Sequence, residues 1–327
     1  MAATGKPVDS HDRIMMSGMA GEPADEGLEI VRSRHPGRWA AAVISVLVFA
    51  WLAHSVATNP NYQWHVVWKY LTVDTVLTGL LWTLGLTVVS MAIGIALGIV
   101  AALMRQSPNP VVSSIAASYI WIFRGTPLLV QLIFWYNLAA LYPQIEIGLP
   151  FMAPFFTIPA NTIVTPIVAA LLGLGLNEGA YMAEIVRSGL LSVDGGQREA
   201  AQSLGLSPTR TIRRIVLPQA LRVIVPPTGN EIIGMLKATS LVSTLAISDL
   251  LYSVQGIYGR TFETIPLLIV ASIWYLVAST LLSVLQTAIE SKLRRGHSAA
   301  PTDGLSRVLM VAKGAVSFRN RSAGRGV

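Results

Sequence analysis

Long apolar stretches without charged residues constrain the fold of this chain more than any other feature of its sequence. Residues 39–57 and 76–104, for example, contain no Lys, Arg, Asp or Glu. A helix that crosses the hydrocarbon core of a membrane needs about 20 mostly apolar residues. Stretches that could form such a helix lie at 39–57, 76–104, 111–141, 162–187, 223–248 and 265–289. The sequence therefore predicts an all-α, polytopic transmembrane helical bundle with six spans.

The composition supports this fold class and excludes several others. Hydrophobic residues make up 53% of the 327 residues and charged residues 13%, against about 25% charged residues in ordinary soluble proteins. These values exclude a disordered chain, a collagen-like repeat and a solvated coiled coil. The chain has no Cys, which also excludes disulfides, thiolate metal sites, Cys nucleophiles and c-type haem attachment.

The positions of the cationic residues predict an orientation in the membrane. If the N-terminus is cytoplasmic, the outer ends of the spans carry only Lys69 and Arg260. The inner ends then carry Arg32, Arg34, Arg38, Arg105, Arg187, Arg198, Arg210, Arg213, Arg214, Arg222, Lys292, Arg294 and Arg295. The positive-inside rule favours this orientation, with both termini in the cytoplasm. The net charge of +7 is therefore a topology signal and requires no nucleic-acid partner.

The two ends of the chain differ in composition from the spans. Residues 1–38 mix acidic, Gly, Ser and Met residues, so we expect a mobile cytoplasmic leader. Residues 39–57 lie too far from the start for a cleavable signal peptide and are expected to be a span. We expect residues 295–327, which are basic and rich in Gly, Ser and Ala, to form a disordered cytoplasmic tail.

The second span carries a stripe of small and polar residues. Thr83, Thr87, Ser90, Gly94 and Gly98 recur at steps of three and four residues, which places them on one helix face. Such a stripe allows close approach of membrane helices. We expect it to pack against a neighbouring helix.

Polar and charged residues also lie inside later spans. Asn177, Tyr181 and Glu184 share one face of the fourth span, with Glu178 beside it, and Glu231 lies in the fifth. A charge near the bilayer centre costs about 2.5–3.5 kcal/mol, so it normally faces a partner or a wet cavity. One interpretation is a structural ion pair, such as Glu184 with Lys237 or Arg124. The other is a polar pathway through the membrane.

The loop at residues 196–218 is predicted to form two short helices joined by a tight turn. Gly205 ends the first helix, Ser207 and Pro208 are a good N-cap and first residue for the second, and Pro218 ends it. The pattern is also similar to a DNA-reading helix-turn-helix. That interpretation is weak because the loop is held between two spans and lacks a third supporting helix. We expect a docking element at the inner membrane surface.

This loop resembles the EAA loop of the permease subunits of ABC importers. The resemblance rests on Glu199, Ala200, Ala201, Gly205, Ile215, Leu217 and Pro218. Residues 123–131, 226–231 and 236–241 are similar to the polar amino-acid subgroup, which imports histidine, glutamate, glutamine, arginine or opines. The resemblance covers residues 76–294 and implies a permease domain in the cell inner membrane, which is not itself an enzyme. It implies that these seven loop residues couple the permease to a cytoplasmic ATPase dimer. It also implies a second permease subunit, the same or paralogous, and an extracytoplasmic substrate-binding protein.

A zwitterionic amino acid needs an anionic partner for its ammonium group and a cationic partner for its carboxylate. Glu184 or Glu178 could bind the ammonium group, and Arg124 or Lys237 the carboxylate. The full set of candidate pathway residues is Arg124, Thr126, Asn177, Glu178, Tyr181, Glu184, Glu231 and Lys237. Of these, Glu184 is expected to line the pathway. No phosphate loop with Gly-Lys-Ser/Thr occurs in the sequence, so ATP and Mg²⁺ are expected on the partner ATPase and no cofactor or metal on this chain.

Two features depart from the subgroup. Its members commonly have five spans, so the span at 39–57 is an addition. The Pro-rich segment 142–161 is longer than usual and is expected near the face that receives the binding protein.

An ion-coupled secondary transporter is an alternative function for this chain. Such proteins normally show two related halves, and no such repeat is visible in the sequence. A membrane-anchored helix-turn-helix regulator is the weaker alternative.

Overall fold

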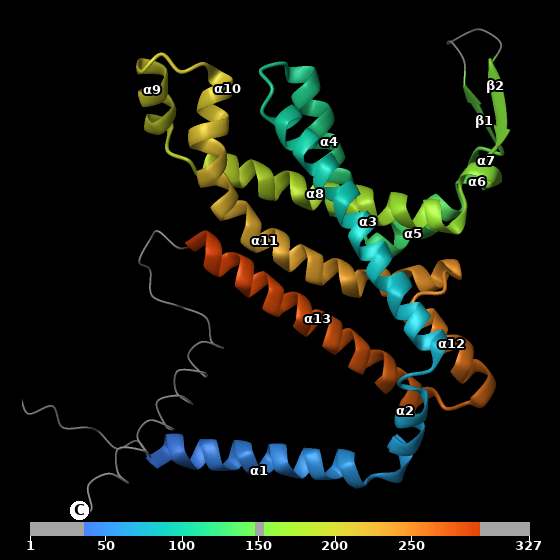
Figure 1. Ribbon diagram of the computed structural model, residues 1–327. Coiled ribbons are helices and arrows are strands. Elements are labelled where there is room, and N and C mark those ends of the chain that lie inside the picture. The colour runs from blue at the N-terminus through green and yellow to red at the C-terminus, as the bar shows by residue number, and fades with distance from the viewer. Residues whose placement is uncertain (1–35, 148–153, 295–327) are drawn as a thin grey trace, which may run out of the picture. The chain divides into compact units, whose positions relative to one another are not determined.

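A computed structural model describes residues 36–147 and 154–294 (Figure 1). The predictions for the leader, for the tail from residue 295 and for residues 148–153 of the Pro-rich segment lie outside the described residues. The chain divides into two units, residues 1–59 and 60–327. Each unit is described by itself.

The first unit contains helix α1, Pro36–Thr58. The stretch Trp39–Thr58 is long and apolar enough to cross a membrane. No residue in its most apolar part is buried by the rest of the described chain. The predicted helix at 39–57 is confirmed.

The second unit is built from helices and one hairpin. Its N-terminal part contains η1 (Pro60–Tyr62), α2 (Trp64–Tyr70), α3 (Asp74–Arg105), α4 (Pro110–Gly125), α5 (Leu128–Tyr136), α6 (Leu138–Leu141), β1 (Gln144–Ile147), β2 (Phe156–Pro159) and α7 (Ala160–Ile163). It continues with α8 (Pro166–Leu191), α9 (Gly195–Ser203), α10 (Pro208–Thr211), η2 (Ile212–Val216), α11 (Leu217–Ala238), η3 (Thr239–Leu245), α12 (Leu250–Thr261) and α13 (Thr264–Arg294). Within residues 36–147 and 154–294 the all-α class is confirmed, apart from the hairpin of β1 and β2.

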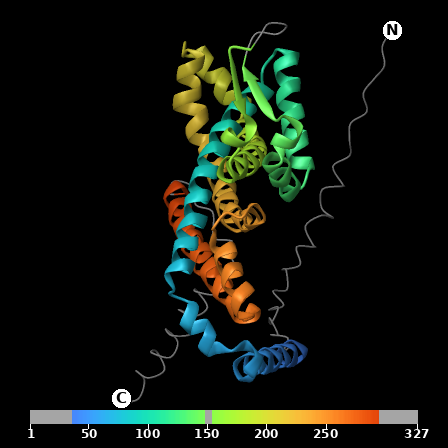
Figure 2. The same cartoon turned by 90° about the vertical axis from the view of Figure 1, so that its right-hand side faces the viewer.

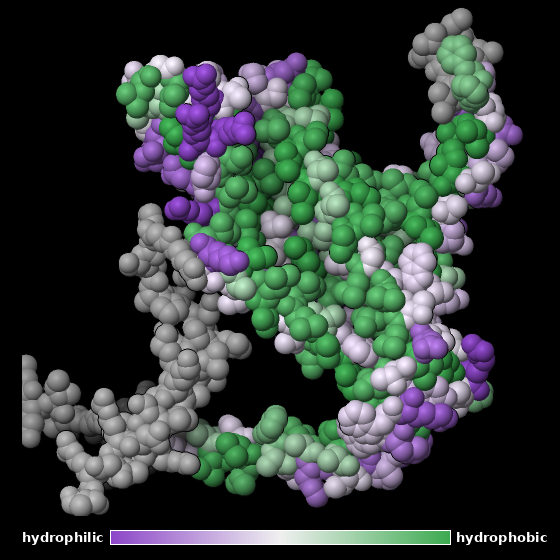
Figure 3. All heavy atoms as spheres, in the orientation of Figure 1, coloured by the Kyte–Doolittle hydropathy of each residue, from purple (hydrophilic) through white to green (hydrophobic). Residues whose placement is uncertain are grey.

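Among the described residues, four helices are long and apolar enough to span a membrane, and up to six spans result if each of two bent helix pairs counts as one. Helices α3, α8 and α13 lie at the predicted spans 76–104, 162–187 and 265–289, with ends that differ by a few residues. Figure 3 shows a broad hydrophobic face over α11 and α13, whereas hydrophilic residues gather over α9 and α10. This division fits a bundle whose middle lies in lipid.

The predicted span at 111–141 is not one continuous helix. Helix α4 ends at Gly125, α5 starts at Leu128, and the two axes differ by 104°. The physical reason is Pro127, which has no backbone N–H and forces the preceding residue out of the helical region. Thr126 accordingly adopts an extended conformation, with φ −114° and ψ 144°.

The predicted boundaries of the fifth span, 223–248, are wrong. Helices α10, η2 and α11 follow one another without an intervening loop, so the helix begins at Pro208 rather than near Val223. Pro218 therefore does not end a helix; it lies in the first turn of α11, directly after the single π-helical turn η2. A π turn changes the pairing of backbone groups locally, which is where the missing N–H of a proline is tolerated. At the other end α11 stops at Ala238, and a bend of 47° separates η3 from α12.

A two-stranded hairpin, which the sequence analysis did not predict, follows the third span. Strands β1 and β2 are antiparallel, with Gln144 opposite Pro159 and Ile147 opposite Phe156. The Pro residues of this segment predicted only the absence of a helix. Residues Gln144–Ile147 alternate polar and apolar side chains over four positions, the shortest length at which this pattern indicates a strand, and the sequence analysis missed this signal.

The centre of the second unit is the contact of α3 with α8 (Figures 1 and 2). All five residues of the small stripe on α3 are buried, so the predicted helix contact is confirmed. Gly94 faces Glu178, and Gly98 faces Met182, which shows that the two helices run in the same direction. Both helices therefore reach the α9–α10 loop end of the bundle with their C-termini.

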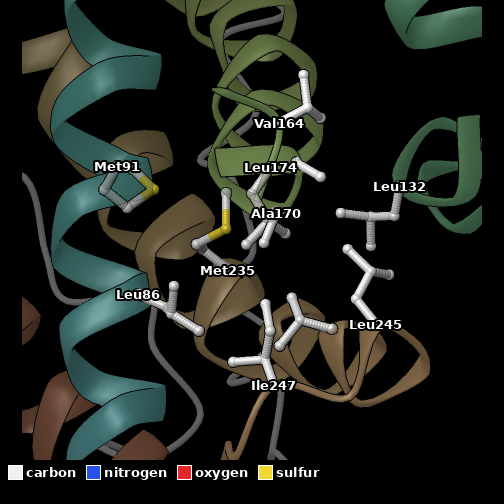
Figure 4. Packing of buried hydrophobic residues seen from close by; sticks show 11 residues of the cluster. Leu86, Met91, Leu132, Val164, Ala170, Leu174, Met235, Leu245 and Ile247 are labelled. Atoms are coloured by element: carbon white, nitrogen blue, oxygen red, sulfur yellow. The ribbon is translucent and has the colours of Figure 1, made fainter. Parts of the chain in front are cut away.

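A hydrophobic cluster joins this pair to the broken helices (Figure 4). Leu86 and Met91 come from α3, Leu174 from α8, Leu132 from α5 and Met235 from α11. The cluster contains Leu132 of α5, with Leu128 packed against it, so it holds the helix that follows the α4–α5 break against α3, α8 and α11. A second cluster packs α2 against α12 and α13, where the indole N–H of Trp274 donates to the main-chain oxygen of Leu71 at 2.8 Å.

Candidate functional site

The turn between α9 and α10 has the geometry that the sequence predicted. Helix α9 is capped by Asp194, whose Oδ1 accepts from the N–H of Gly196 at 2.7 Å. Gly205 has φ +73°. The N–H of Leu206 donates to the oxygen of Ala201, and that of Gly205 to the oxygen of Gln202. This pair of bonds is a Schellman motif, which requires a left-handed residue and so favours glycine.

This turn exposes an apolar side chain. Leu204 is 81% exposed, Glu199 and Ala200 beside it are also exposed, and Ala201 is buried. The sequence analysis identified the glycine but missed Leu204. The only available signal was an apolar residue directly before a C-terminal glycine, where it has no helix neighbour to cover it.

The second half of the loop is partly as predicted. Ser207 precedes α10 in an extended conformation but makes no side-chain cap bond, so the N-cap position is confirmed without its hydrogen bond. Ile215 is half-buried, whereas Leu217 and Pro218 are exposed on the helix that continues into α11. Together, these residues present a helix-turn-helix surface beside the C-terminal end of α8.

The break between α4 and α5 is held by two amide side chains. Nε2 of Gln131 donates to the main-chain oxygens of Phe123 and Thr126 at 3.0 and 3.1 Å, and to Oγ1 of Thr126 at 2.7 Å. Nδ2 of Asn177 on α8 donates to the same Phe123 oxygen at 2.8 Å. Asn177 and Thr126, two candidate pathway residues, therefore lie at the break and bind protein groups. Gln131, which is 7% exposed, lies in the segment 123–131, but its sequence context did not single it out as a site residue.

Three other candidates line one open groove of about 480 Å³ between α4 and α8. Arg124 lies with its guanidinium carbon 5.2 Å from the ring centre of Tyr181, a cation–π geometry. Glu184 lines the same groove one turn further along α8. The complete lining is Arg105, Ala117, Ile120, Trp121, Arg124, Gly125, Tyr181 and Glu184. Arg105 and Trp121 did not stand out in the sequence.

The ion partner of Glu184 differs from both expected candidates. Oε2 of Glu184 accepts from Nη2 and Nε of Arg187 at 2.6 and 3.0 Å, which is an i, i+3 pair on α8. Lys237, by contrast, is exposed on α11. An ion pair of Glu184 with Lys237 or Arg124 is therefore not what the structure shows.

Glu178 lies in a different environment from Glu184. It is 4% exposed, and its Oε1 has no hydrogen-bond partner among the described residues; the same holds for Oγ of Ser90 on the facing helix. Glu231 on α11 is half-buried, and its charge interacts with those of Glu178 and Arg124. The Glu231 carboxyl group is thus close enough to Glu178 and to Arg124 for electrostatic interaction with each. Among residues 36–147 and 154–294, no three His, Asp or Glu side chains come together as metal ligands.

The sequence matches a known family over this whole region. Residues 94–295 match the model of the binding-protein-dependent transport system inner membrane component, so the chain belongs to that family. The arginine transport system permease protein of Corynebacterium glutamicum is 44% identical over 291 residues, which cover 86% of this chain and 88% of that protein. The glutamine transport system permease protein of Escherichia coli is 30% identical over 237 residues, which cover 72% and 99%.

Solved structures lead to the same family. The structure titled an amino acid ABC transporter with histidines is 35% identical, has a TM-score of 0.57 and covers 71% of this chain and 98% of its own. The MetNI methionine ABC transporter, at 18% identity and a TM-score of 0.54, shares the fold. The resemblance inferred from the loop residues is confirmed, and the chain is an integral inner-membrane permease.

Proposed function

We propose that this protein is the permease subunit of an ATP-driven importer that takes up a polar amino acid by alternating access. The observation that carries this proposal is the turn at Gly205, in a chain that belongs to the importer family. The left-handed turn presents Glu199, Ala200 and Leu204 outside the membrane bundle. Two backbone hydrogen bonds fix the turn while Leu204 stays exposed, so the turn offers a partner an apolar contact in a defined position.

The partner at this turn would be a cytoplasmic ATPase dimer. The seven residues of the EAA loop would contact it, and ATP and Mg²⁺ would be bound by the ATPase, with no cofactor on this chain. ATP-driven closure of the dimer would displace the turn and the helices joined to it. A second permease subunit, the same or paralogous, would complete the pathway, because one five-span core cannot enclose it symmetrically.

The names of the relatives support a polar amino acid as substrate. They include permeases for arginine, nopaline and glutamine. The carboxyl groups of Glu178 and Glu231 interact electrostatically, and among the described residues neither has an ion-pair partner within 4.0 Å. Two such groups suit a cationic side chain, which makes arginine the first substrate to test. The pathway set stays Arg124, Thr126, Asn177, Glu178, Tyr181, Glu184, Glu231 and Lys237.

The same proposal includes an arrangement in the membrane. Both termini would be cytoplasmic, residues 39–57 would form an additional span, and residues 76–294 the permease domain. The hairpin of β1 and β2 lies at the end of the bundle away from the α9–α10 loop (Figure 1). It would therefore lie near the face that receives the extracytoplasmic binding protein.

Reconstitution tests the proposal. The permease is copurified with its ATPase subunit, inserted into liposomes and supplied with the binding protein and radiolabelled arginine, glutamine or histidine. We expect uptake that requires ATP on the ATPase side and the binding protein on the other. Uptake that follows an ion gradient without ATP would instead indicate a secondary transporter, and failure of any ATPase subunit to copurify would contradict the docking of the turn.

A further inference from the structure

The groove between α4 and α8 carries charges of alternating sign along its length. Arg124 lies at one end, next to Tyr181, and Glu184 follows one helical turn further along α8. Arg105, the last residue of α3, lines the other end. Since α3 and α8 both point their C-termini to the α9–α10 loop, the order from the bundle centre to that loop is positive, negative, positive.

Each charged side chain is anchored but keeps free hydrogen-bonding groups. Nη1 of Arg105 donates to Oγ of Ser113 at 2.9 Å, and this hydroxyl donates back to the main-chain oxygen of Arg105 at 3.1 Å. The guanidinium group has five N–H donors in total, and this bond to Ser113 uses one of them. Arg124 is held by stacking on Tyr181, which uses none of its donors.

Glu184 also retains an acceptor. Both bonds from Arg187 go to Oε2, and within the described residues no hydrogen bond to Oε1 is found. Arg187 therefore fixes the orientation of the carboxylate without saturating it. Trp121, which is 76% exposed, forms an apolar wall of the groove beside Arg124 and Glu184.

We propose that this groove is a binding site for the amino acid as a zwitterion. Oε1 of Glu184 binds the ammonium group, while Arg124 and Arg105 are alternative positions for the carboxylate on its two sides. The substrate leaves the centre of the bundle when its carboxylate passes from Arg124 to Arg105. Arg105 and Trp121 are thereby specificity-determining residues that neither the sequence motifs nor the relatives assign. This inference rests on the proposed function, because it assumes that an amino acid reaches the groove.

The signs of the three charges distinguish a zwitterionic amino acid from a simple anion as the ligand of the groove. A phosphate group, free or in a lipid headgroup, would bind the two arginines and be repelled by Glu184. A zwitterion needs both signs. The volume of about 480 Å³ falls in the range of roughly 300–1,000 Å³ that is typical of small-molecule sites.

Equilibrium binding tests the inference. The complete complex with its ATPase subunits is placed in phosphatidylcholine nanodiscs without nucleotide or binding protein, and binding of radiolabelled arginine is measured. Competition with agmatine, which lacks the carboxylate of arginine, reports recognition of that group. Loss of one charge-assisted contact corresponds to about a tenfold change in affinity. We expect this loss in Arg124→Gln and Glu184→Gln, and Arg124→Gln should no longer distinguish arginine from agmatine.

Arg105 and Arg187 provide the finer tests. Arg105→Gln should make import less sensitive to excess arginine on the ATPase side, and Arg105→Lys should restore that sensitivity. Arg187→Gln leaves the Glu184 carboxylate in place but no longer oriented, so it should weaken arginine binding less than Glu184→Gln does. A purely structural ion pair would instead make Arg187→Gln and Glu184→Gln equally damaging to yield and binding. Arg260→Gln, on an exposed arginine bonded only within α12, is the matched control and should behave as wild type.

Several results would overturn the inference. Unchanged arginine binding in Glu184→Gln, together with weaker binding when phosphatidylglycerol replaces phosphatidylcholine, would assign the groove to a phosphate headgroup. If the wild-type complex imports arginine and all groove variants bind arginine normally, the inference about the groove is wrong and the proposed function stands. A wild-type complex that neither imports nor binds any of the three amino acids would instead remove the proposed function.

Discussion

The side chains of Gln131 and Asn177 lie 46 positions apart in the sequence and are joined by a hydrogen bond of 3.3 Å from Nδ2 of Asn177 to Oε1 of Gln131. Both side chains also donate to the main-chain oxygen of Phe123. This oxygen lies near the end of α4. In a continuous helix it would accept a hydrogen bond from the N–H of residue 127, but Pro127 has no N–H. Two side chains therefore replace the helix hydrogen bonds that the break removes.

Removing the amide of Gln131 should destabilise the bundle. Gln131→Leu leaves the partly buried oxygens of Phe123 and Thr126 with fewer donors, at a cost of about 1 kcal/mol for each bond lost. Thermal unfolding in detergent should show a lower midpoint. Gln219→Leu, which removes one exposed bond to the oxygen of Ile215, should leave the midpoint nearly unchanged. Equal midpoints for the two variants would contradict the role of Gln131.

Close packing at Gly94 should make this position intolerant of a methyl group. A Cβ there would overlap the Cγ and Cβ atoms of Glu178, and overpacking of this kind costs about 1–3 kcal/mol. Gly94→Ala should lower the folded yield and the unfolding midpoint. Gly85→Ala, on the same helix but with no atom within 4 Å of the new Cβ, should be tolerated. A normal midpoint for Gly94→Ala would show that α3 and α8 can separate without loss.

Gly205 should be required by its backbone conformation alone. No atom lies within 4 Å of a Cβ built there, but its φ is +73°, where a β-branched residue is strained by about 1–3 kcal/mol. Gly205→Val should insert normally yet copurify less ATPase and show weaker stimulation of ATP hydrolysis. Gly195→Val, at the open start of α9, is the control on the same loop. ATPase association equal to that of wild type would contradict the coupling assignment.

Leu204 should contribute apolar contact to the same partner. Its side chain is 81% exposed in this chain, so Leu204→Asp should not disturb the fold. Burying a leucine side chain at an interface is worth about 1.5–3 kcal/mol, and association with the ATPase should weaken about tenfold or more. Gln202→Asp adds the same charge on the exposed side of α9 and should weaken it less. If both variants associate equally, charge rather than Leu204 determines the contact.

Reporter fusions should reveal the orientation of the chain. We expect a reporter after Pro150 to lie on the outer side, and reporters after Gly205 and Gly296 in the cytoplasm. The reason is the concentration of cationic residues at one set of span ends. An externally accessible residue 205 would contradict both the orientation and the docking of an ATPase there.

The elements that sequence could predict are those governed by local chemistry. The apolar lengths of α1, α3, α8 and α13 and the left-handed Gly205 follow from residues adjacent in the chain. The burial of the stripe on α3 follows from helix periodicity. These predictions needed no knowledge of which helices are neighbours.

The errors arose where distant residues decide the outcome. Pro127 breaks a helix but Pro218, Pro226 and Pro227 do not, because the cost of a proline depends on what else satisfies the backbone nearby. The partner of Glu184 was sought on other helices, whereas Arg187 lies one turn away on α8. Gln131, Trp121 and Arg105 became visible only once α3, α4 and α8 were brought together.

The uninterrupted helix from Pro208 to Ala238 has a consequence for insertions and deletions. At about 1.5 Å per residue it is roughly 45 Å long, and it joins the turn at Gly205 to the depth of Glu231 without a flexible connection. The direction in which Glu231 points about the helix axis is therefore fixed relative to the turn at Gly205. A single inserted residue in α11 would turn Glu231 by about 100° away from Glu178, whereas seven inserted residues, close to two turns, would nearly restore its direction. The number of residues between the turn and the acidic pair is thus fixed by helical geometry, independently of which residues they are.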